Sequence, residues 1–393
     1  TSGDTLRIQQ DIDEGPVTVD RDLFIEGLTG AETVGAVQDT GTSGDARAWF
    51  LVDDGVALIV RGLRFDGNGF RIFQAFRHRG FGLFDQVSFN DIQFDPSGPL
   101  YQGIAIVAFG DRVDVVNSTF SQIGRVGVLF FGTGVQGALY LENHYVGKGD
   151  GDFLDYGVEL NGGATAWILE SSIQDCRGVA SVDGSTSGAI LTTTFSGAGT
   201  AVSAISNHLL DNTTGAAVGF PGIADSTVGV FAFNRLFGNG NGLSAATSVE
   251  VVAENNWWGC NGGPGTAGCD TTAVTNSGAV DSDPWLILDG ASFRWVKPLT
   301  TITLKADLRG NSDGVDVSTM GLVPDGIPGS FADNGSFGTL LPTTVGSVAG
   351  LWQTLFVAGP DEGESTVTVT VDGQDLESLV RVEVGLFCDG FES

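Results

Sequence analysis

The segment 143–156 contains the side chains best suited to acid–base chemistry. It carries His144 and Tyr156 together with Lys148, which is one of only three lysines in the chain. Lys148 could remove a proton as a general base, and Tyr156 could supply one as a general acid. A solvated turn rich in Gly and Asp is the plainer interpretation of the same residues.

Two groups of oxygen-bearing side chains are candidates for binding calcium. The first group lies in the same segment and consists of Asp150, Asp152 and Asp155. The second group consists of Asn311, Asp313 and Asp316. The second group has the oxygen spacing of calcium loops but lacks the terminal Glu that completes such a loop. Calcium is therefore the one cofactor that the sequence suggests.

One basic cluster stands out in an acidic chain. Arg71, Arg77 and Arg79, with His78 between the last two, fall within nine consecutive residues. Their guanidinium groups could hold an anionic sugar or the acidic face of a neighbouring subunit. Salt bridges within the chain are the alternative interpretation.

The four cysteines do not have the spacing of a zinc site. We expect Cys260 to bond with Cys269, because a short loop with Gly and Pro inside it closes easily. Such a disulfide predicts an oxidising, exported location. Cys176 and Cys388 could then pair with each other or between chains.

Composition excludes some partners. The formal net charge is −30, and a field of that sign repels nucleic acid and anionic membranes. No run of about 18 apolar residues occurs, so we expect no membrane span. Glycine accounts for 60 of 393 residues without a Gly-X-Y period, which predicts a chain that folds through many tight turns.

Short apolar strands separated by Gly and Asn position these candidates. Examples are 56–60, 113–117 and 230–234, and the pattern recurs mostly at intervals in the low to upper twenties of residues. A strand, a polar bend and a second short strand at this period indicate a β-solenoid, in which each coil buries its inward side chains by stacking on its neighbours. We assign residues 47–288 to this solenoid and residues 1–46 to an N-terminal cap with the first strands.

The end of the repeats carries a resemblance to a known fold. The sequence Asn-Trp-Trp-Gly-Cys at 256–260 and the later Asp-Pro-Trp-Leu at 283–286 resemble the terminal coil of bacterial right-handed parallel β-helix proteins of the pectate-lyase-like superfamily. Enzymes of this kind act on acidic polysaccharides with calcium-binding Asp clusters and an Arg or Lys base. The motifs of polygalacturonases, pectate lyases and mannuronan epimerases are absent from this sequence.

The C-terminal part has a different pattern. Residues 289–385 alternate Val or Thr with polar residues over several short strands, which predicts a β-sandwich. The layout resembles bacterial Ig-like domains of cell-surface proteins. The tail 386–393 resembles the Cys-Asp-Gly-Phe-Glu tail of some exported bacterial proteins.

Together these patterns predict an all-β chain, a right-handed parallel β-helix followed by an Ig-like β-sandwich. The favoured hypothesis is a non-enzymatic extracellular or cell-surface protein with a structural or adhesive role. It would associate with itself, in a head-to-tail filament that uses the C-terminal tail, or with a surface polysaccharide. The alternatives are a lyase, hydrolase or epimerase acting on an acidic polysaccharide, and passive carbohydrate binding.

Overall fold

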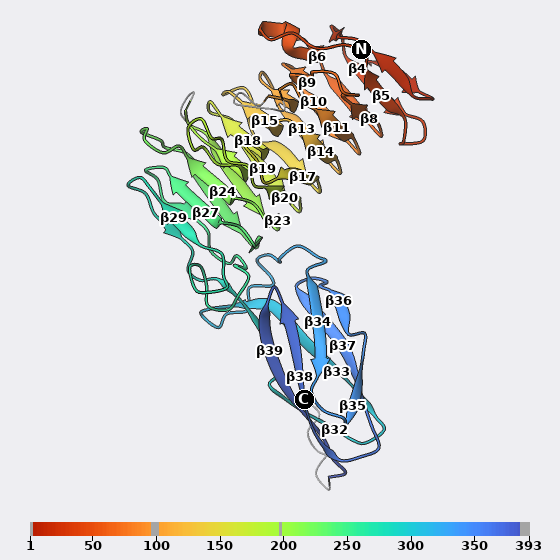
Figure 1. The fold of residues 1–393 in the computed structure, drawn as a ribbon, viewed down its shortest axis with the longest axis vertical. Coiled ribbons are helices and arrows are strands. Elements are labelled where there is room, and N and C mark those ends of the chain that lie inside the picture. The colour runs from red at the N-terminus through yellow and green to blue at the C-terminus, as the bar shows by residue number, and fades with distance from the viewer. Residues whose placement is uncertain (1–2, 96–101, 196–198, 386–393) are drawn as a thin grey trace. The chain divides into compact units, whose positions relative to one another are not determined.

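The computed structural model describes residues 3–95, 102–195 and 199–385. Contacts between Cα atoms divide the chain into two units. The β-helix unit is Thr1–Ala253 with Asp270–Asp281, and the sandwich unit is Glu254–Cys269 with Ser282–Ser393. The strands confirm the predicted all-β class, with a parallel β-helix followed by a β-sandwich (Figure 1). Among the described residues no helix is long and apolar enough to cross a membrane.

Three parallel sheets form the β-helix unit, and the coils up to β27 contribute one strand to each sheet. Sheet I contains β1 (Asp4–Ile8), β4 (Leu23–Gly27), β7 (Leu58–Arg61), β10 (Gly82–Asp85), β13 (Val113–Val116), β16 (Ala138–Leu141), β19 (Thr165–Leu169), β22 (Ala201–Ile205), β25 (Val228–Ala232), β28 (Val251–Val252) and β30 (Val280–Asp281). Sheet II contains β2 (Ile12–Glu14), β5 (Thr33–Ala36), β8 (Arg64–Asp66), β11 (Ser88–Ile92), β14 (Thr119–Ile123), β17 (His144–Gly149), β20 (Ser172–Cys176), β23 (His208–Leu210) and β26 (Arg235–Phe237).

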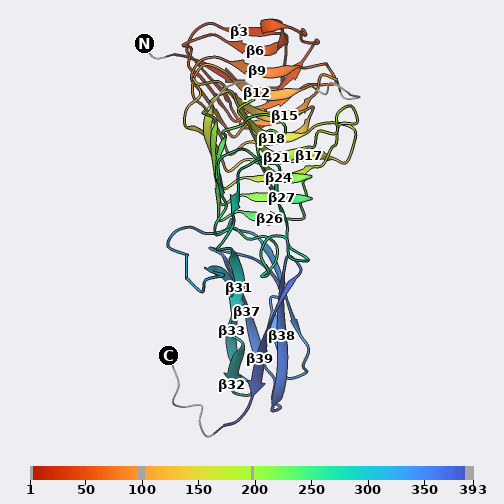
Figure 2. The same cartoon turned by 90° about the vertical axis from the view of Figure 1, so that its left-hand side faces the viewer.

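Sheet III positions the candidate site. It contains β3 (Val17–Val19), β6 (Ala48–Val52), β9 (Gln74–His78), β12 (Ile104–Ala108), β15 (Val126–Phe131), β18 (Tyr156–Asn161), β21 (Gly188–Thr192), β24 (Thr214–Gly219), β27 (Asn241–Ala246) and β29 (Thr272–Val274). Figure 2 shows strands of this sheet stacked one above another. The short 3₁₀-helix η1 (Gly44–Arg47) directly precedes β6.

Equivalent residues of successive coils stack inside the β-helix. Phe65, Phe89 and Phe120 lie in register in sheet II, and their rings stack with centroids 5.5 and 5.3 Å apart. Each of these rings is at most 1% exposed. Burying a side chain of this size contributes about 1.5–3 kcal/mol, so a coil gains stability only when its neighbours cover it.

Buried amide side chains support the corners between the sheets. At one corner the Ser171 backbone N–H donates to Asn207 Oδ1 (2.9 Å), and the Asn207 N–H donates to Asn234 Oδ1 (3.0 Å). All three residues are almost completely buried. Each amide therefore satisfies a backbone donor of the coil before it, at a bend where no strand partner is available.

A second ladder of side chains ends at a carboxylate. The Cys176 N–H donates to Asn212 Oδ1 (2.9 Å), and the Asn212 N–H donates to Asn239 Oδ1 (3.0 Å). The Asn239 amide then donates to Asp270 Oδ2 at 2.6 Å. Asp270 is 6% exposed, and its burial raises its pKa to about 6.

Two sheets form the sandwich. Sheet IV has the order β31 (Leu286–Gly290), β33 (Thr301–Asn311), β37 (Leu351–Ala358) and β35 (Gly338–Leu341). Sheet V has the order β32 (Phe293–Val296), β39 (Gln374–Val382), β38 (Gly363–Val371), β34 (Pro328–Asp333) and β36 (Thr344–Gly346). Neighbouring strands are antiparallel except for β32 and β39, which are parallel.

The double-tryptophan turn belongs to the sandwich unit. Trp257 is completely buried, and its indole N–H donates to Asp372 Oδ2 at 2.8 Å. The Asn261 backbone N–H donates to Gln374 Oε1 at 2.9 Å. The predicted disulfide between Cys260 and Cys269 is present in the same turn.

Candidate functional site

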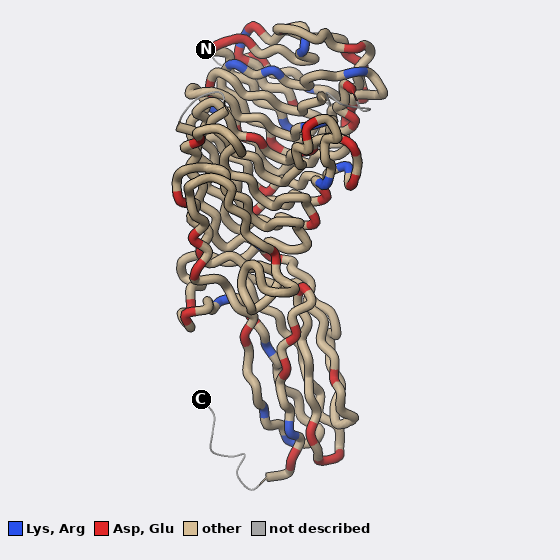
Figure 3. The backbone as a smooth tube through the Cα atoms, turned by 60° about the vertical axis from the view of Figure 1, so that its left-hand side comes forward, with Lys and Arg blue, Asp and Glu red and all other residues tan. Residues whose placement is uncertain are grey.

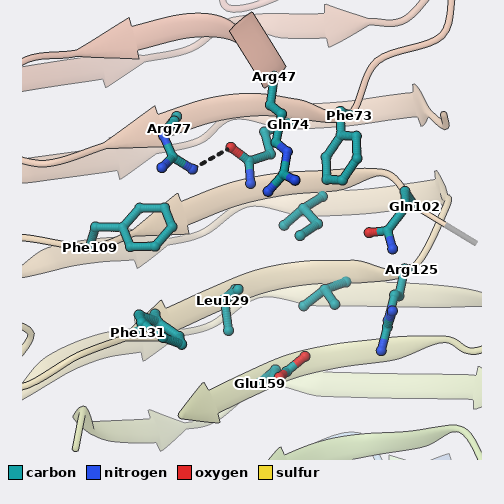
Figure 4. A pocket seen from close by; sticks show the side chains of 12 residues that line it. Arg47, Phe73, Gln74, Arg77, Gln102, Phe109, Arg125, Leu129, Phe131 and Glu159 are labelled. Atoms are coloured by element: carbon teal, nitrogen blue, oxygen red, sulfur yellow. Dashed lines mark hydrogen bonds between the residues drawn. The ribbon is translucent and has the colours of Figure 1, made fainter. Parts of the chain in front are cut away.

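The outer face of sheet III carries a pocket of about 470 Å³. Its lining comes from η1 and from the four strands β9, β12, β15 and β18, together with residues that flank them. Figure 4 shows charged and aromatic side chains from these successive coils around the same hollow. The pocket is therefore built by the stacking of coils, and no single segment of the sequence contains it.

Two residues of β9 line the pocket, on either side of two buried positions. In β9 the consecutive residues Ala75 and Phe76 are both buried, whereas Gln74 and Arg77 line the pocket. The first of the two buried positions is Ala or Gly in every strand of sheet III from β9 to β27, as at Gly127 in β15. A Cβ atom on Gly127 would lie 2.5 Å from the carbonyl oxygen of Gly157. Only a small residue allows the backbone to approach the next coil this closely.

Three arginines line the pocket, in a chain with 18 Lys and Arg residues and 48 Asp and Glu residues. Arg47 lies over the Phe73 ring (4.7 Å to the centroid), and Arg77 lies over the Phe109 ring (4.3 Å). Arg125 directly precedes β15. Stacking on an aromatic ring fixes a guanidinium plane and leaves the N–H groups, which point along that plane, able to form hydrogen bonds. Figure 3 shows how sparse Lys and Arg are along the chain.

Arg77 is held on two further sides. Its Nη1 donates to Gln74 Oε1 at 3.2 Å, and its Nε donates to Asp45 Oδ1 at 3.2 Å. Burial of its side chain and the nearby Arg79 lower the pKa of Arg77. A guanidinium remains charged despite such a shift, so a partly desolvated cation faces the pocket.

Glu159 lines the pocket together with these arginines, and among the described lining residues it is the only carboxylate. Burial raises its pKa, while the charge of Arg125 and a hydrogen bond with Asn161 oppose that rise. A titratable group with a raised pKa in a pocket is a candidate for sensing or exchanging a proton.

Apolar side chains form the floor. Ile104, Val107, Val126 and Tyr156 make a buried cluster, against which Phe109 and Leu129 pack. An apolar floor with a few charged groups at its edge is the usual composition of a binding pocket for a small molecule or a sugar.

The predicted acid–base residues do not converge. Lys148 Nζ donates to the carbonyl oxygen of Gly124, and its burial lowers its pKa. The Tyr156 hydroxyl donates to the carbonyl oxygen of Thr186 at 2.9 Å, and burial raises its pKa. His144 begins β17 in sheet II and is exposed. Both candidate proton-transfer groups thus have hydrogen bonds to the backbone of other coils.

The three aspartates of the same segment also have separate partners. Asp150 pairs with Arg177 at 3.7 Å, and Asp152 accepts a hydrogen bond from the Ser181 hydroxyl at 2.7 Å. Asp155 is completely buried and accepts hydrogen bonds from the Tyr145 hydroxyl and from the Lys148 N–H (2.7 Å). Burial raises the pKa of Asp155 to about 6.

The second calcium candidate lies in the sandwich unit. Asn311 is buried, donates to Asn255 Oδ1 at 3.0 Å and accepts from the Val315 N–H at 3.1 Å. Asp316 accepts from the Ser318 N–H at 2.9 Å, and Asp313 is exposed. Within the described residues no group of three or more His, Cys, Asp or Glu side chains is placed to hold a metal ion.

Two arginines of the predicted basic cluster form salt bridges within the chain. Arg77 and Arg79 both pair with Asp45, and Arg77 also faces the pocket. Arg71 donates to the carbonyl oxygen of Phe94 at 2.8 Å. Cys176 is buried and is not in a disulfide among the described residues. Its suggested partner, Cys388, lies outside the described residues.

Most of the pocket was not predicted from the sequence. Arg47, Arg125 and Glu159 are far apart in the sequence and come from separate coils. Arg77 is in register with Leu129 two coils further on and with Glu159 three coils further on, so the three residues occupy equivalent positions in their strands. An alignment of the coils with one another would have been the signal, but their unequal lengths hide that register.

No protein-family model matches this sequence, and no curated protein matches it. Among solved structures, the S-layer protein SbsC domains 4 and 5 match at 15% identity and a TM-score of 0.18, over 26% of this chain and 55% of that one. The S-layer protein rSbsC(31-844) matches at 15% identity and a TM-score of 0.20, over 27% of this chain and 14% of that one. The match thus spans about half the length of the first structure and a smaller part of the second. Scores this low assign neither a fold nor a function.

Proposed function

We propose that this chain is an exported structural protein that binds an acidic polysaccharide on the outer face of sheet III. The observation that carries the proposal is the gathering of Arg47, Arg77 and Arg125 around one aromatic pocket of about 470 Å³. The function is passive binding, and it would anchor the protein to a carbohydrate surface.

The chemistry of the pocket fits a sugar acid. A guanidinium presents paired N–H donors that match the two oxygens of a carboxylate. The rings of Phe73, Phe109 and Phe131 line the same pocket and could cover the apolar face of a pyranose ring. The net charge of −30 repels a polyanion from the protein as a whole, so binding has to depend on this local reversal of charge.

The proposed location rests on the disulfide between Cys260 and Cys269. Disulfides persist in oxidising compartments and are rare in reducing ones. Export places the protein where surface polysaccharides occur.

An enzymatic function has less support. Lys148 and Tyr156, the proposed base and acid, donate their hydrogen bonds to backbone carbonyl oxygens. Glu159 has no second carboxylate beside it among the described lining residues, whereas glycoside hydrolysis normally uses a pair. Membership of the pectate-lyase-like superfamily and of the Ig-like domains remains a proposal, as does calcium binding. A filament that uses the tail 386–393 is also a proposal, because the tail lies outside the described residues.

Affinity measurements with polygalacturonate, alginate and dextran test the proposal. The wild-type protein should bind the two polyanions and not neutral dextran, and added salt should weaken the binding. Replacing both Arg77 and Arg125 by Ala should lower the affinity by a factor of about ten or more, because a hydrogen bond to a charged group contributes about 1.5–3 kcal/mol. The matched control is Arg112→Ala, which removes an exposed arginine paired with Asp114.

Two results would overturn the proposal. One is equal affinity of the double variant and the wild type for the polyanions. The other is a lyase or hydrolase activity on these polymers, seen by ultraviolet absorbance or reducing-sugar assays and lost in Lys148→Ala. The second result would restore the enzymatic hypothesis.

A further inference from the structure

A second hollow of about 390 Å³ lies on the same outer face of sheet III, further along the stack of coils. Its lining comes from β18, β21, β24 and β27 and from the loops beside them. Tyr156 belongs to the apolar cluster under the first pocket and also lines the second hollow. The two hollows are therefore neighbours on one sheet.

The floor of the second hollow follows from the register of the strands. Leu191, Ala217 and Ser244 occupy the outward position equivalent to Arg77, Leu129 and Glu159 of the first pocket. The side chains of Ala217 and Ser244 are smaller than that of Leu191, so they leave a depression in the outer surface of the sheet. Gly188 lies beside Tyr156 in the neighbouring row, and both residues line the hollow.

Two phenylalanines stand at the rim in contact with water. Phe220 lines the hollow and is 38% exposed, and Phe195 is 62% exposed. Their ring centroids are 5.4 Å apart. Neighbouring coils hold these two rings side by side, and exposed aromatic side chains that cluster in this way usually mark a binding surface.

The second hollow differs from the first in charge. Among the described residues that line it there is no Arg or Lys, whereas three arginines line the first pocket. Its polar groups are the Asp183 carboxylate, hydroxyls such as that of Ser185, and backbone atoms. A carboxylate repels an acidic sugar and accepts hydrogen bonds from the hydroxyls of a neutral one.

Together the two hollows span a polymer-sized distance. Arg77 in β9 and Ser244 in β27 are six coil steps apart along sheet III. At about 4.8 Å between neighbouring strands, this spans roughly 29 Å. One small molecule cannot contact both ends, but an extended chain of linked sugars can.

We propose that the second hollow is a subsite for an uncharged sugar unit, which stacks on Phe195 and Phe220 and gives hydrogen bonds to Asp183. The ligand is then a heteropolysaccharide, with an acidic unit at the arginine pocket and a neutral unit further along the same chain. That both sugar units belong to one polymer rests on the proposed function.

Calorimetric titration with three probes tests the inference. The probes are an oligogalacturonate, a neutral oligomer of N-acetylglucosamine, and hyaluronan, in which glucuronate and N-acetylglucosamine alternate. The wild type should bind hyaluronan oligomers long enough to reach both hollows more tightly than it binds either homopolymer. The double variant Phe195→Ala with Phe220→Ala should lose about tenfold or more in affinity for long hyaluronan and for the neutral oligomer. Its affinity for oligogalacturonate should remain unchanged.

The matched control is Trp167→Ala, which removes an aromatic side chain that is 48% exposed on sheet I. Unchanged affinity of the phenylalanine double variant for both hyaluronan and the neutral oligomer would overturn the inference and leave the proposed function standing. If the arginine variants keep full affinity for oligogalacturonate while the phenylalanine variant loses the neutral oligomer, the proposed function fails and the neutral-sugar subsite stands.

Discussion

Replacing Asp270 by Asn should stabilise the β-helix unit at neutral pH and leave its stability unchanged in acid. Asp270 closes the ladder of buried side chains that runs through Asn212 and Asn239. The carboxylate accepts the backbone N–H of Asn239 on Oδ1 and its side-chain N–H on Oδ2. An amide has one acceptor oxygen, which can accept both hydrogen bonds in the way that Asn239 Oδ1 accepts both from Asn212. It can do so without placing a charge in a site that is 6% exposed.

The magnitude follows from linkage between protonation and folding. Burial raises the pKa of Asp270 from 3.8 to about 6, so the folded protein favours the neutral carboxyl group. The stability that this group contributes is present in full below pH 3.8 and is lost as the pH rises towards 6. At pH 8 the loss amounts to about 3 kcal/mol, because one pKa unit corresponds to about 1.4 kcal/mol. The neutral amide of Asp270→Asn avoids that loss.

Urea unfolding of wild type and variant at pH 4, 6 and 8 measures the effect. The difference between their free energies of unfolding should be small at pH 4 and should grow to about 3 kcal/mol in favour of the variant at pH 8. Asp313→Asn provides the matched control, because this aspartate is exposed and lies in the sandwich unit. A difference that does not change with pH, or a variant less stable than wild type at pH 8, would refute the reasoning.

Three further perturbations test other parts of the structure. Burial lowers the pKa of His78 from 6.5 to about 4, so the stability it contributes is present above pH 6.5 and is lost as the pH falls to 4. Between pH 7 and pH 4 the free energy of unfolding should therefore fall by about 3 kcal/mol less in His78→Leu than in the wild type. Gly157→Ala should lower the stability of the β-helix unit by about 1–3 kcal/mol in thermal unfolding, because its Cβ would lie 2.5 Å from Cγ2 of Ile173. Asp372→Ala should cost the sandwich unit about 1–3 kcal/mol in urea unfolding, because it leaves the buried indole N–H of Trp257 without that acceptor.

Each of these predictions has an outcome that contradicts it. If wild type and His78→Leu lose the same free energy of unfolding between pH 7 and pH 4, a group other than His78 causes the loss. Gly310→Ala is the control for Gly157→Ala, because a Cβ atom on Gly310 would meet nothing within 4 Å beyond its chain neighbours and should be tolerated. For Asp372→Ala, unchanged stability would mean that the turn at 254–269 does not depend on this hydrogen bond.

The fold class could be predicted because a local pattern repeats in the sequence. Short, mainly apolar strands such as 56–60 and 113–117 recur along the chain, and the structure pairs β7, β10 and β13 in parallel register. Coils that cannot bury their own side chains have to stack, and this requirement acts at every coil. The Cys260–Cys269 disulfide was predictable for the same local reason, since a short loop with Gly and Pro brings the two residues together.

The site was predicted less well, because proximity in sequence was taken for proximity in space. The segment 143–156 collects Lys148, Tyr156 and three carboxylates, yet Lys148, Tyr156 and Asp152 have hydrogen-bond partners in other coils. Asp155 is held within the segment, by Tyr145 and Lys148. In a β-helix the neighbours of a residue are one coil away. A cluster of reactive residues along a single coil is therefore spread over different faces.

The sequence by itself determined the repeating strands, the acidic charge and the disulfide, because each depends on composition or on residues close together in the chain. Only the tertiary structure decided which outward residues share a surface. Arg47, Arg77, Arg125 and Glu159 come together because unequal loops bring strands of sheet III into register. That register is the one that buries the apolar side chains of all coils together. It depends on the whole stack, so no local segment of the sequence encodes it.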